Sequence, residues 1–216
     1  MSIQNVSAFK DCYIMQLDDI KSFADTLADG FNQYSMFQYA CNGKYDHDKM
    51  RLFWAVTIAV IADNAICIAD SPEFNSVLAY VRPKSKEASF IDYVKAGGLK
   101  MFLKLGWRST IKLMRFDAEM QKVAKRLKDE NDGYLMCFAT RLDKQGQGYG
   151  KPLMESLLRY LDSAGEGCYL ETMKATNVEL YKRFSFELTE HTTLKTGNLP
   201  LYAMRRSPAR TAPTMS

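Results

Sequence analysis

Hydrophobic positions at the start of the chain predict a strand followed by a helix. Residues 12–17 alternate weakly between polar and apolar side chains, and an Asp-Asp pair follows them as a candidate N-cap. Beyond this pair, Ile20, Phe23 and Leu27 return at a spacing of three to four residues. Because this spacing places them on one face of a helix, we expect a helix that ends near Ala28.

The next apolar segments predict a helix and a hairpin. Residues 50–62 are apolar over helical length, although their β-branched side chains leave a strand open. Two short apolar runs, 64–70 and 76–81, are separated by the turn-forming sequence SPEFN, so we expect them to pair antiparallel. Pro83 ends the hairpin, because proline has no N–H to give to a strand ladder.

From about residue 88 to residue 127 the chain is rich in Lys, Leu and Met at helical spacing. Gly97-Gly98 and Gly106 interrupt this pattern. Since glycine weakens a helix interior, we expect two or three helices, packed over one side of the sheet.

The second half of the chain predicts a central strand, a glycine-rich turn and an amphipathic helix in succession. Residues 134–141 form a near-continuous apolar run, which is typical of a strand covered on both faces. After the turn, leucines line one side of a helix until Gly165 ends it. The remaining pattern predicts strands at 168–173, 186–191 and 201–205 and a short helix at 177–184.

Composition narrows the class of protein. A chain of 216 residues with 47% hydrophobic and 25% charged residues has the size and balance of one globular domain. The net charge is +4 and the pI about 8.7, too weakly basic to indicate nucleic-acid binding but compatible with a cleft for an anionic small molecule.

Cysteine and histidine usage argues against metal and disulfide chemistry. The five cysteines stand singly and the two histidines lack ligand spacing, so we expect neither a disulfide framework nor a metal site. The start of the chain has no secretory pattern, and the longest apolar run, 52–62, is far shorter than the roughly 20 residues that a bilayer requires. We therefore expect a cytoplasmic protein without a membrane or nucleic-acid partner.

The sequence QGQGYG at 145–150 is the segment that carries chemistry. Its glycines admit φ > 0 and leave peptide N–H groups uncovered. Because the turn also opens a helix, the free amides of the first turn and the helix dipole favour an anion such as a diphosphate. A tight strand-to-helix turn that needs glycine only for its geometry is the alternative.

The glycine turn matches neither of the two best-known phosphate loops. It contains no GxxxxGK[ST], and its glycines do not have GxGxxG spacing. Instead, 145–150 resembles the Q/R-x-x-G-x-G/A signature of the GNAT superfamily, the acetyl-coenzyme A-dependent N-acetyltransferases. Downstream, CYLETMKATNVELYKRFSFE at 168–187 is similar to the second landmark of this superfamily, with Ser185 where a glycine is usual.

The closing sequence LYAMRRSP resembles the last strand of puromycin N-acetyltransferase-like members. The resemblance implies an α/β fold: a mixed, mostly antiparallel central sheet with splayed central strands and helices on both faces. It also implies a single acetyltransferase domain over 1–206, with a helical insertion at about 84–127, followed by a disordered tail at 207–216.

The resemblance assigns most of the site to coenzyme binding. The diphosphate is expected on the turn and the pantetheine arm along the strand before it, with a backbone N–H near Phe138 or Ala139 as the oxyanion donor. Lys144 and Lys151 flank the turn and are candidates for the 3′-phosphate. The coenzyme-binding residues implied are Phe138, Ala139, Thr140, Gln145, Gly146, Gln147, Gly148, Tyr149, Gly150, Lys151 and Asn177.

Tyr181 and Glu171 are the candidate catalytic residues. Tyr181 resembles the general acid of the family, with a packed aromatic as the alternative. Glu171 is the best-placed carboxylate for a general base, although a surface ion pair with Lys174 or Arg183 is an equally good interpretation. Asn177 resembles a coenzyme contact and is also a candidate N-cap of its own helix.

Three functions remain in competition. The first is transfer of an acetyl group from acetyl-coenzyme A to the primary amine of a small molecule, by direct attack in a ternary complex. The second is acetylation of a protein or peptide, and the third is non-catalytic binding of an acyl-coenzyme A. The long segment at 84–127 favours a closed site for a small acceptor, and the sequence leaves a homodimer open.

Overall fold

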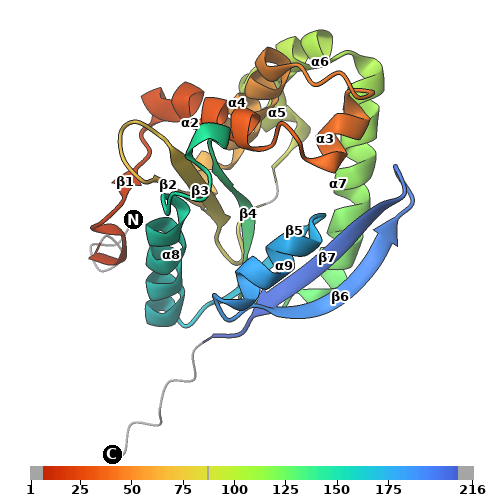
Figure 1. Ribbon diagram of the computed structural model, residues 1–216. Coiled ribbons are helices and arrows are strands. Elements are labelled where there is room, and N and C mark those ends of the chain that lie inside the picture. The colour runs from red at the N-terminus through yellow and green to blue at the C-terminus, as the bar shows by residue number, and fades with distance from the viewer. Residues whose placement is uncertain (1–6, 87, 209–216) are drawn as a thin grey trace, which may run out of the picture.

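A computed structural model describes residues 7–86 and 88–208 and shows one mixed sheet with helices on both faces (Figure 1). The order of its strands is β1-β2-β3-β4-β5-β7-β6. The strands are β1 (Tyr13–Ile14), β2 (Ala65–Ala69), β3 (Ser76–Val81), β4 (Asp132–Thr140), β5 (Gly167–Thr172), β6 (Glu187–Leu194) and β7 (Leu199–Arg206). The expected α/β fold with a mostly antiparallel sheet is confirmed.

The only parallel pair in the described sheet is β4 with β5, and it is short. The two strands are in register from Asp132↔Gly167 to Tyr134↔Tyr169, and no pairing follows beyond those residues. On its other side, β4 stays paired with β3 as far as Thr140. The sheet is therefore open between the carboxyl-terminal parts of β4 and β5, which confirms the expected splay.

Each face of the sheet has its own helices and apolar core. On one face lie α2 (Ile20–Gly30), α3 (Ser35–Ala40) and α4 (His47–Ile61), with Phe23, Phe37 and Trp54 in the core beneath them. On the other face lies α8 (Gly150–Ala164), which buries Leu153, Leu157 and Leu161. The short helix α9 (Ala175–Lys182) adds Val178 and Tyr181 to this second core.

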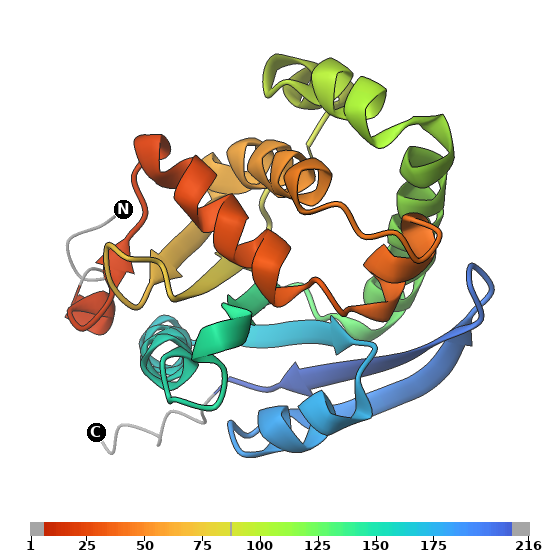
Figure 2. The ribbon, with the colours of Figure 1, turned by 45° about the horizontal axis from the view of Figure 1, so that its top comes forward.

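Three helices connect β3 to β4: α5 (Phe90–Lys95), α6 (Gly98–Leu105) and α7 (Trp107–Leu127). α7 packs on the sheet beside β6 and β7 and buries Phe116 and Val123 (Figure 2). By contrast, α5 and α6 contact α4. The expectation that this whole segment covers the sheet is therefore correct for α7 and wrong for α5 and α6.

Two local expectations differ from the structure. The first strand is shorter than residues 12–17, because the Asp19 carboxylate accepts hydrogen bonds from the Gln16 N–H (2.8 Å) and the Tyr13 hydroxyl (2.9 Å) and starts a helical turn there. The six-residue helix α3 was not expected, since it is too short for a 3.6-residue period to show in the sequence.

The paired beginnings of β4 and β5 are fixed by buried polar contacts. The carboxylate of Asp132, which is 1% exposed, accepts hydrogen bonds from Arg205 Nε (2.5 Å) and Nη2 (3.1 Å) on β7. A Cβ on Gly133 would stand 2.0 Å from the Tyr80 hydroxyl oxygen, so only glycine fits there. These contacts tie β4 to β3 and β7 at the point from which β4 and β5 diverge.

Three further observations concern the described part of the chain. Within it, no helix has both the length and the apolar composition needed to cross a membrane. The described residues also contain no group of His, Cys, Asp and Glu side chains that could hold a metal ion. The expected disordered tail falls mostly on residues 209–216, which lie outside the described residues.

Candidate active site

The opening between β4 and β5 leaves one edge of β4 without a strand partner. Residues 135–140 pair with β3 on one side only. A shift of register between Ala79 and Tyr80 leaves Met136 as an extra residue in β4, which bends the strand at the start of the opening. Peptide groups along such an edge need hydrogen-bond partners, and an extended ligand can supply them.

The glycine turn lies at the carboxyl end of β4 and presents free peptide N–H groups. Among the described residues, no acceptor is found for the amides of Gly146, Gly148 and Tyr149. The amide of Gln147 has a weak internal acceptor, the Lys144 carbonyl at 3.4 Å. The amide of Gly150 has no acceptor in the described part of the chain either, so four of the five amides expected to hold the diphosphate have no internal partner and that of Gln147 is partly engaged.

The three glycines of the turn have two different roles. Gly146 (φ +75°) and Gly148 (φ +89°) adopt left-handed conformations, and a Cβ on either would meet open space. Glycine is thus required there by backbone conformation, not by crowding. At Gly150 a Cβ would stand 2.6 Å from Cζ of Phe138, so this glycine lets the first turn of α8 approach β4 closely.

Polar side chains around the turn bind the protein itself. Gln145 donates from Nε2 to the Thr140 carbonyl (3.1 Å) and so ties the turn to the end of β4. Lys144 pairs with Asp143 (3.5 Å) and Lys151 with Glu155 (3.7 Å). Pairs this exposed are weak, so both ammonium groups can turn toward an anion at little cost.

Tyr181 lies in the second core with its ring against Phe186 at 5.8 Å. Its side chain is 7% exposed, and its hydroxyl has no hydrogen-bond partner among the described residues. Burial, followed by the nearby Tyr34, Cys168 and Cys137, raises the pKa of Tyr181 well above its usual value. Cys137 on β4 and Cys168 in the paired part of β5 are therefore close to Tyr181.

Asn177 does not cap its own helix. α9 begins at Ala175 with Lys174 as its N-cap residue, and Asn177 is its third residue. The side-chain amide of Asn177 donates to the Thr172 hydroxyl (3.0 Å) at the end of β5. The N-cap interpretation is therefore wrong, and this amide is held at the edge of the opening. Ser185 has φ +62°, a conformation that favours the glycine usual at this position.

A cavity of about 990 Å³ lies at the other end of the opening, under the helices that connect β3 to β4. Its walls come from α4, α5, α7, the end of β3 and the loop that follows it. Tyr134 and Met136 of β4 and Glu171 of β5 contribute the sheet side. This volume is at the upper end of the usual range for small-molecule sites.

Glu171 is the titratable group of β5 in this cavity. Its carboxylate accepts hydrogen bonds from the hydroxyls of Tyr134 (2.9 Å) and Tyr169 (2.8 Å). Burial raises the pKa of Glu171 to about 7. The two tyrosine hydroxyls and Lys128 oppose this rise, whereas Asp117 of α7 adds to it. No ion pair with Lys174 or Arg183 is present among the described residues, so that interpretation of Glu171 is wrong.

Tyr134, Tyr169 and Asp117 belong to the site and were not identified from the sequence. The two tyrosines come together because they face each other in the short parallel register, a pairing that no local sequence pattern shows. Asp117 is on α7, among residues whose spacing indicates only a solvated helix face. Their role emerges only from the tertiary arrangement.

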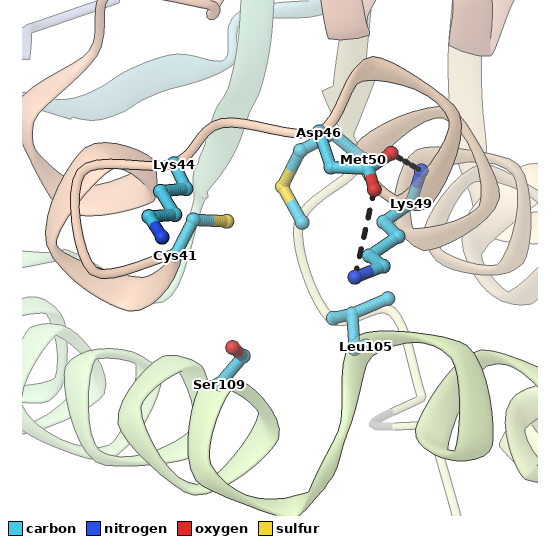
Figure 3. A pocket seen from close by; sticks show the side chains of 7 residues that line it. All are labelled: Cys41, Lys44, Asp46, Lys49, Met50, Leu105 and Ser109. Atoms are coloured by element: carbon cyan, nitrogen blue, oxygen red, sulfur yellow. Dashed lines mark hydrogen bonds and ion pairs between the residues drawn. The ribbon is translucent and has the colours of Figure 1, made fainter.

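A second, much smaller pocket of about 50 Å³ lies between the loop after α3 and the junction of α6 and α7. It is lined by Cys41, Lys44, Asp46, Lys49, Met50, Leu105 and Ser109 (Figure 3). Asp46 caps α4 there by accepting from the Lys49 N–H at 3.1 Å. The pocket holds a few water molecules at most and includes no residue of β4 or β5.

A mixed sheet that opens between two parallel strands, with a glycine turn and a helix at the end of the first of them, is the arrangement of the GNAT fold. The sequence model of the Acetyltransferase (GNAT) family matches residues 111–186, which include the opening, the turn and Tyr181. Over this segment the chain has the sequence pattern of a GNAT N-acetyltransferase, and enzymes of that family take their acyl group from an acyl-coenzyme A.

Known proteins with a similar sequence or fold span almost the whole chain. An uncharacterised N-acetyltransferase of Schizosaccharomyces pombe is 22% identical over 205 residues, 90% of this chain and 82% of the relative. A solved histone acetyltransferase HPA2-related protein of Corynebacterium glutamicum is 18% identical, with a TM-score of 0.63 over 93% of this chain and 97% of its own. Arylalkylamine N-acetyltransferase 2 of Aedes aegypti is 10% identical, with a TM-score of 0.58 over 91% and 97%. At these identities the solved structures show the fold alone.

Proposed function

We propose that this protein transfers an acetyl group from acetyl-coenzyme A to the primary amine of a small molecule, by direct attack in a ternary complex. One observation carries the proposal: β4 runs from a 990 Å³ cavity that contains Glu171 to a turn with unpartnered amides. The two ends of one open strand edge thereby offer a place for an amine and a place for a diphosphate.

The coenzyme is proposed to bind along β4. The free amides of Gly146, Gly148 and Tyr149 would hold the diphosphate at the positive end of the α8 dipole. The unpaired edge from Phe138 to Thr140 would accept the pantetheine arm in the manner of an added strand. A backbone N–H near Phe138 or Ala139 would then stabilise the oxyanion.

Glu171 is proposed as the general base. An ammonium group must lose a proton before it can attack, and a carboxylate with a pKa of about 7 is partly ionised at neutral pH and accepts that proton readily. The hydroxyls of Tyr134 and Tyr169 hold both carboxylate oxygens in place. Glu171 thus takes the proton from the ammonium group, and the neutral amine nitrogen then attacks the acetyl carbon, which releases the thiolate of the coenzyme.

Tyr181 is proposed as the general acid for the leaving thiolate. Burial keeps its hydroxyl protonated. A thiolate released in a buried site takes up a proton readily, because burial disfavours its charged form. The unpartnered hydroxyl can supply that proton.

The size of the cavity supports a small acceptor over a protein, since about 990 Å³ is the volume of a small-molecule site. α5 and α7 line part of its wall. We further propose that α5–α7 are an insertion in a single acetyltransferase domain over 1–206. Membership of the puromycin N-acetyltransferase-like branch is proposed on the closing LYAMRRSP alone.

The test is release of free thiol from acetyl-coenzyme A in the presence of arylalkylamines, polyamines, aminonucleosides and short lysine peptides. We expect turnover with at least one small amine, and a fall in kcat of about 10²–10⁴-fold in Tyr181→Phe, since only the hydroxyl is lost. Tyr160→Phe is the matched control, because Tyr160 is also buried but donates to Glu166, at the opposite end of α8 from the glycine turn.

Two results would replace the proposal. Turnover confined to peptides would identify a protein acetyltransferase. Tight binding of acetyl-coenzyme A without transfer to any amine, unchanged in Tyr181→Phe, would identify a binding or sensing protein.

A further inference from the structure

The corner formed by α5, α6 and the start of α7 concentrates the exposed apolar surface of the molecule. Among the described residues, seven large apolar side chains are more than half exposed, and six of them lie between residues 90 and 114. Only Leu17 is elsewhere. The six, which we call the corner patch, are Phe90 (83%), Ile91 (61%), Leu99 (66%), Leu103 (72%), Trp107 (59%) and Met114 (65%).

The patch follows the helical period and is therefore a face. On α6, Leu99 and Leu103 are four residues apart, and on α7, Trp107 and Met114 are seven apart. α6 contacts both α5 and α7, so the exposed apolar residues of the three helices lie in one region of the fold. In both views this corner stands at the edge of the molecule, away from the sheet (Figures 1 and 2).

Cations are interleaved with the patch. Residues 90–115 contain six Lys and Arg and a single acid, Asp92, so their net charge is +5. The net charge of the whole chain is +4, and all other residues together therefore carry −1. Lys100, Lys104 and Arg108 are exposed and form no ion pair with any described residue. The guanidinium of Arg108 lies over the Trp107 ring at 5.2 Å.

We propose that the corner patch docks on an anionic lipid surface. Exposed Leu, Phe and Trp side chains insert at the boundary of headgroups and acyl chains, while Lys and Arg extend their charged ends to the lipid phosphates. An anionic leaflet matches the +5 charge of this segment, which the rest of the chain does not share. The proposal is independent of the acetyl transfer proposed above.

The positive charge around the corner patch argues against a second copy of the chain as its binding partner. A twofold dimer places the same surface on both partners, so the cations of one corner would face the same cations of the other. An acidic protein partner meets the charge requirement as well. The exposed Trp107 beside Arg108 favours lipid, because tryptophan and basic residues are enriched where a membrane meets water.

The test measures co-sedimentation with vesicles of phosphatidylcholine alone and of phosphatidylcholine with phosphatidylserine. We expect the wild type to bind the anionic vesicles, to bind neutral vesicles at least tenfold more weakly, and to release in high salt. Leu99→Ser/Leu103→Ser removes two apolar contacts. Lys100→Gln/Lys104→Gln removes two cations, each worth about fivefold in partitioning, and should weaken binding about 30-fold.

Two matched controls separate the patch from general surface effects. Leu17 is as exposed as Leu103, 71% against 72%, so Leu17→Ser should leave vesicle binding unchanged. Lys10 and Lys21 are exposed and remote in sequence from the corner, so Lys10→Gln/Lys21→Gln should also have little effect. All substituted residues are exposed, and circular dichroism checks that each variant is folded.

Four outcomes would overturn the proposal. The first is no binding of the wild type to anionic vesicles. The second is equal loss in the corner and control variants. The third is a dimer in gel filtration that Leu99→Ser/Leu103→Ser dissociates, which would assign the patch to a second copy. Retention of an acidic protein, with no affinity for vesicles, would likewise replace lipid by protein as the partner.

Discussion

The two ends of the β4–β5 pair are built in opposite ways. At the amino-terminal end the strands are in register. There the Asp132 carboxylate accepts a hydrogen bond from Arg205. Gly133 lies so close to Tyr80 that a Cβ would not fit. At the carboxyl-terminal end the same strands part, and free amides, an unpartnered tyrosine hydroxyl and a glutamate of raised pKa border the opening.

This contrast shows how one strand pair serves both stability and chemistry. At the closed end the buried Asp132 carboxylate is satisfied by another part of the chain, and this contact helps to fix where the strands diverge. The open end leaves polar groups for a ligand to satisfy. Substitutions at the closed end should therefore change stability, and those at the open end should change binding or turnover.

The largest expected effect comes from the closed end. Asp132→Ala removes a buried carboxylate and should lower the free energy of unfolding by about 3 kcal/mol, because Arg205 Nε and the Asp129 N–H lose their acceptor. Urea denaturation measures the loss. Asp162→Ala is the matched control: Asp162 pairs with the next residue, Arg206, but is 43% exposed, and should cost less than about 1 kcal/mol. Equal losses of unfolding free energy in the two variants would show that the buried Asp132 contributes no more stability than an exposed ion pair.

The next effect concerns the base. Glu171→Gln should lower kcat/KM about 10- to 100-fold above neutral pH, and the wild-type rise of activity through a pH of about 7 should be absent from the variant. Initial rates from pH 6 to roughly 9 give both profiles. Glu187→Gln on β6, an exposed carboxylate, should keep the wild-type profile. If the activity of Glu171→Gln still rose through a pH of about 7, as in the wild type, Glu171 would be excluded as the base.

The same titration has a consequence for stability. The pKa of Glu171 is raised in the fold from 4.5 to about 7, so the folded state favours the protonated acid. The stability that this preference contributes is fully present below pH 4.5 and is lost as the pH rises toward 7. Relative to Glu171→Gln, the wild type should become less stable over this interval, which thermal melts at several pH values can follow.

The smallest of these effects is expected at the turn. Gly148→Ala forces a Cβ into a left-handed conformation that costs about 1–2 kcal/mol, and the turn should relax and weaken coenzyme binding about tenfold. Gly43→Ala is the control, since Gly43 also has positive φ and open space around it but lies in a remote loop. It should cost similar stability and leave the KM for acetyl-coenzyme A unchanged. A raised KM in both would refute a binding role for the turn.

Most of the fold could be predicted from the sequence because its elements have local signals. The apolar run before QGQGYG, the leucines of α8 and the hairpin of β2 and β3 carry their periods and turn residues in the sequence. α3 was missed because six residues show no period, and β1 was overextended because a side-chain cap stops it. The exposed faces of α5 and α6 were missed because a helical pattern does not say whether its apolar side is covered.

The sequence by itself determined the turn, since QGQGYG between an apolar strand and an amphipathic helix leaves few local conformations for its amides. It also placed Tyr181 and Glu171 at element ends through a recognisable order of motifs. Only the tertiary structure decided what surrounds them. Glu171 owes its pKa to Tyr134 and Tyr169, which meet in a short parallel register, and to burial under helices distant in sequence. Burial and pairing across strands depend on the whole fold, so no local pattern can encode them.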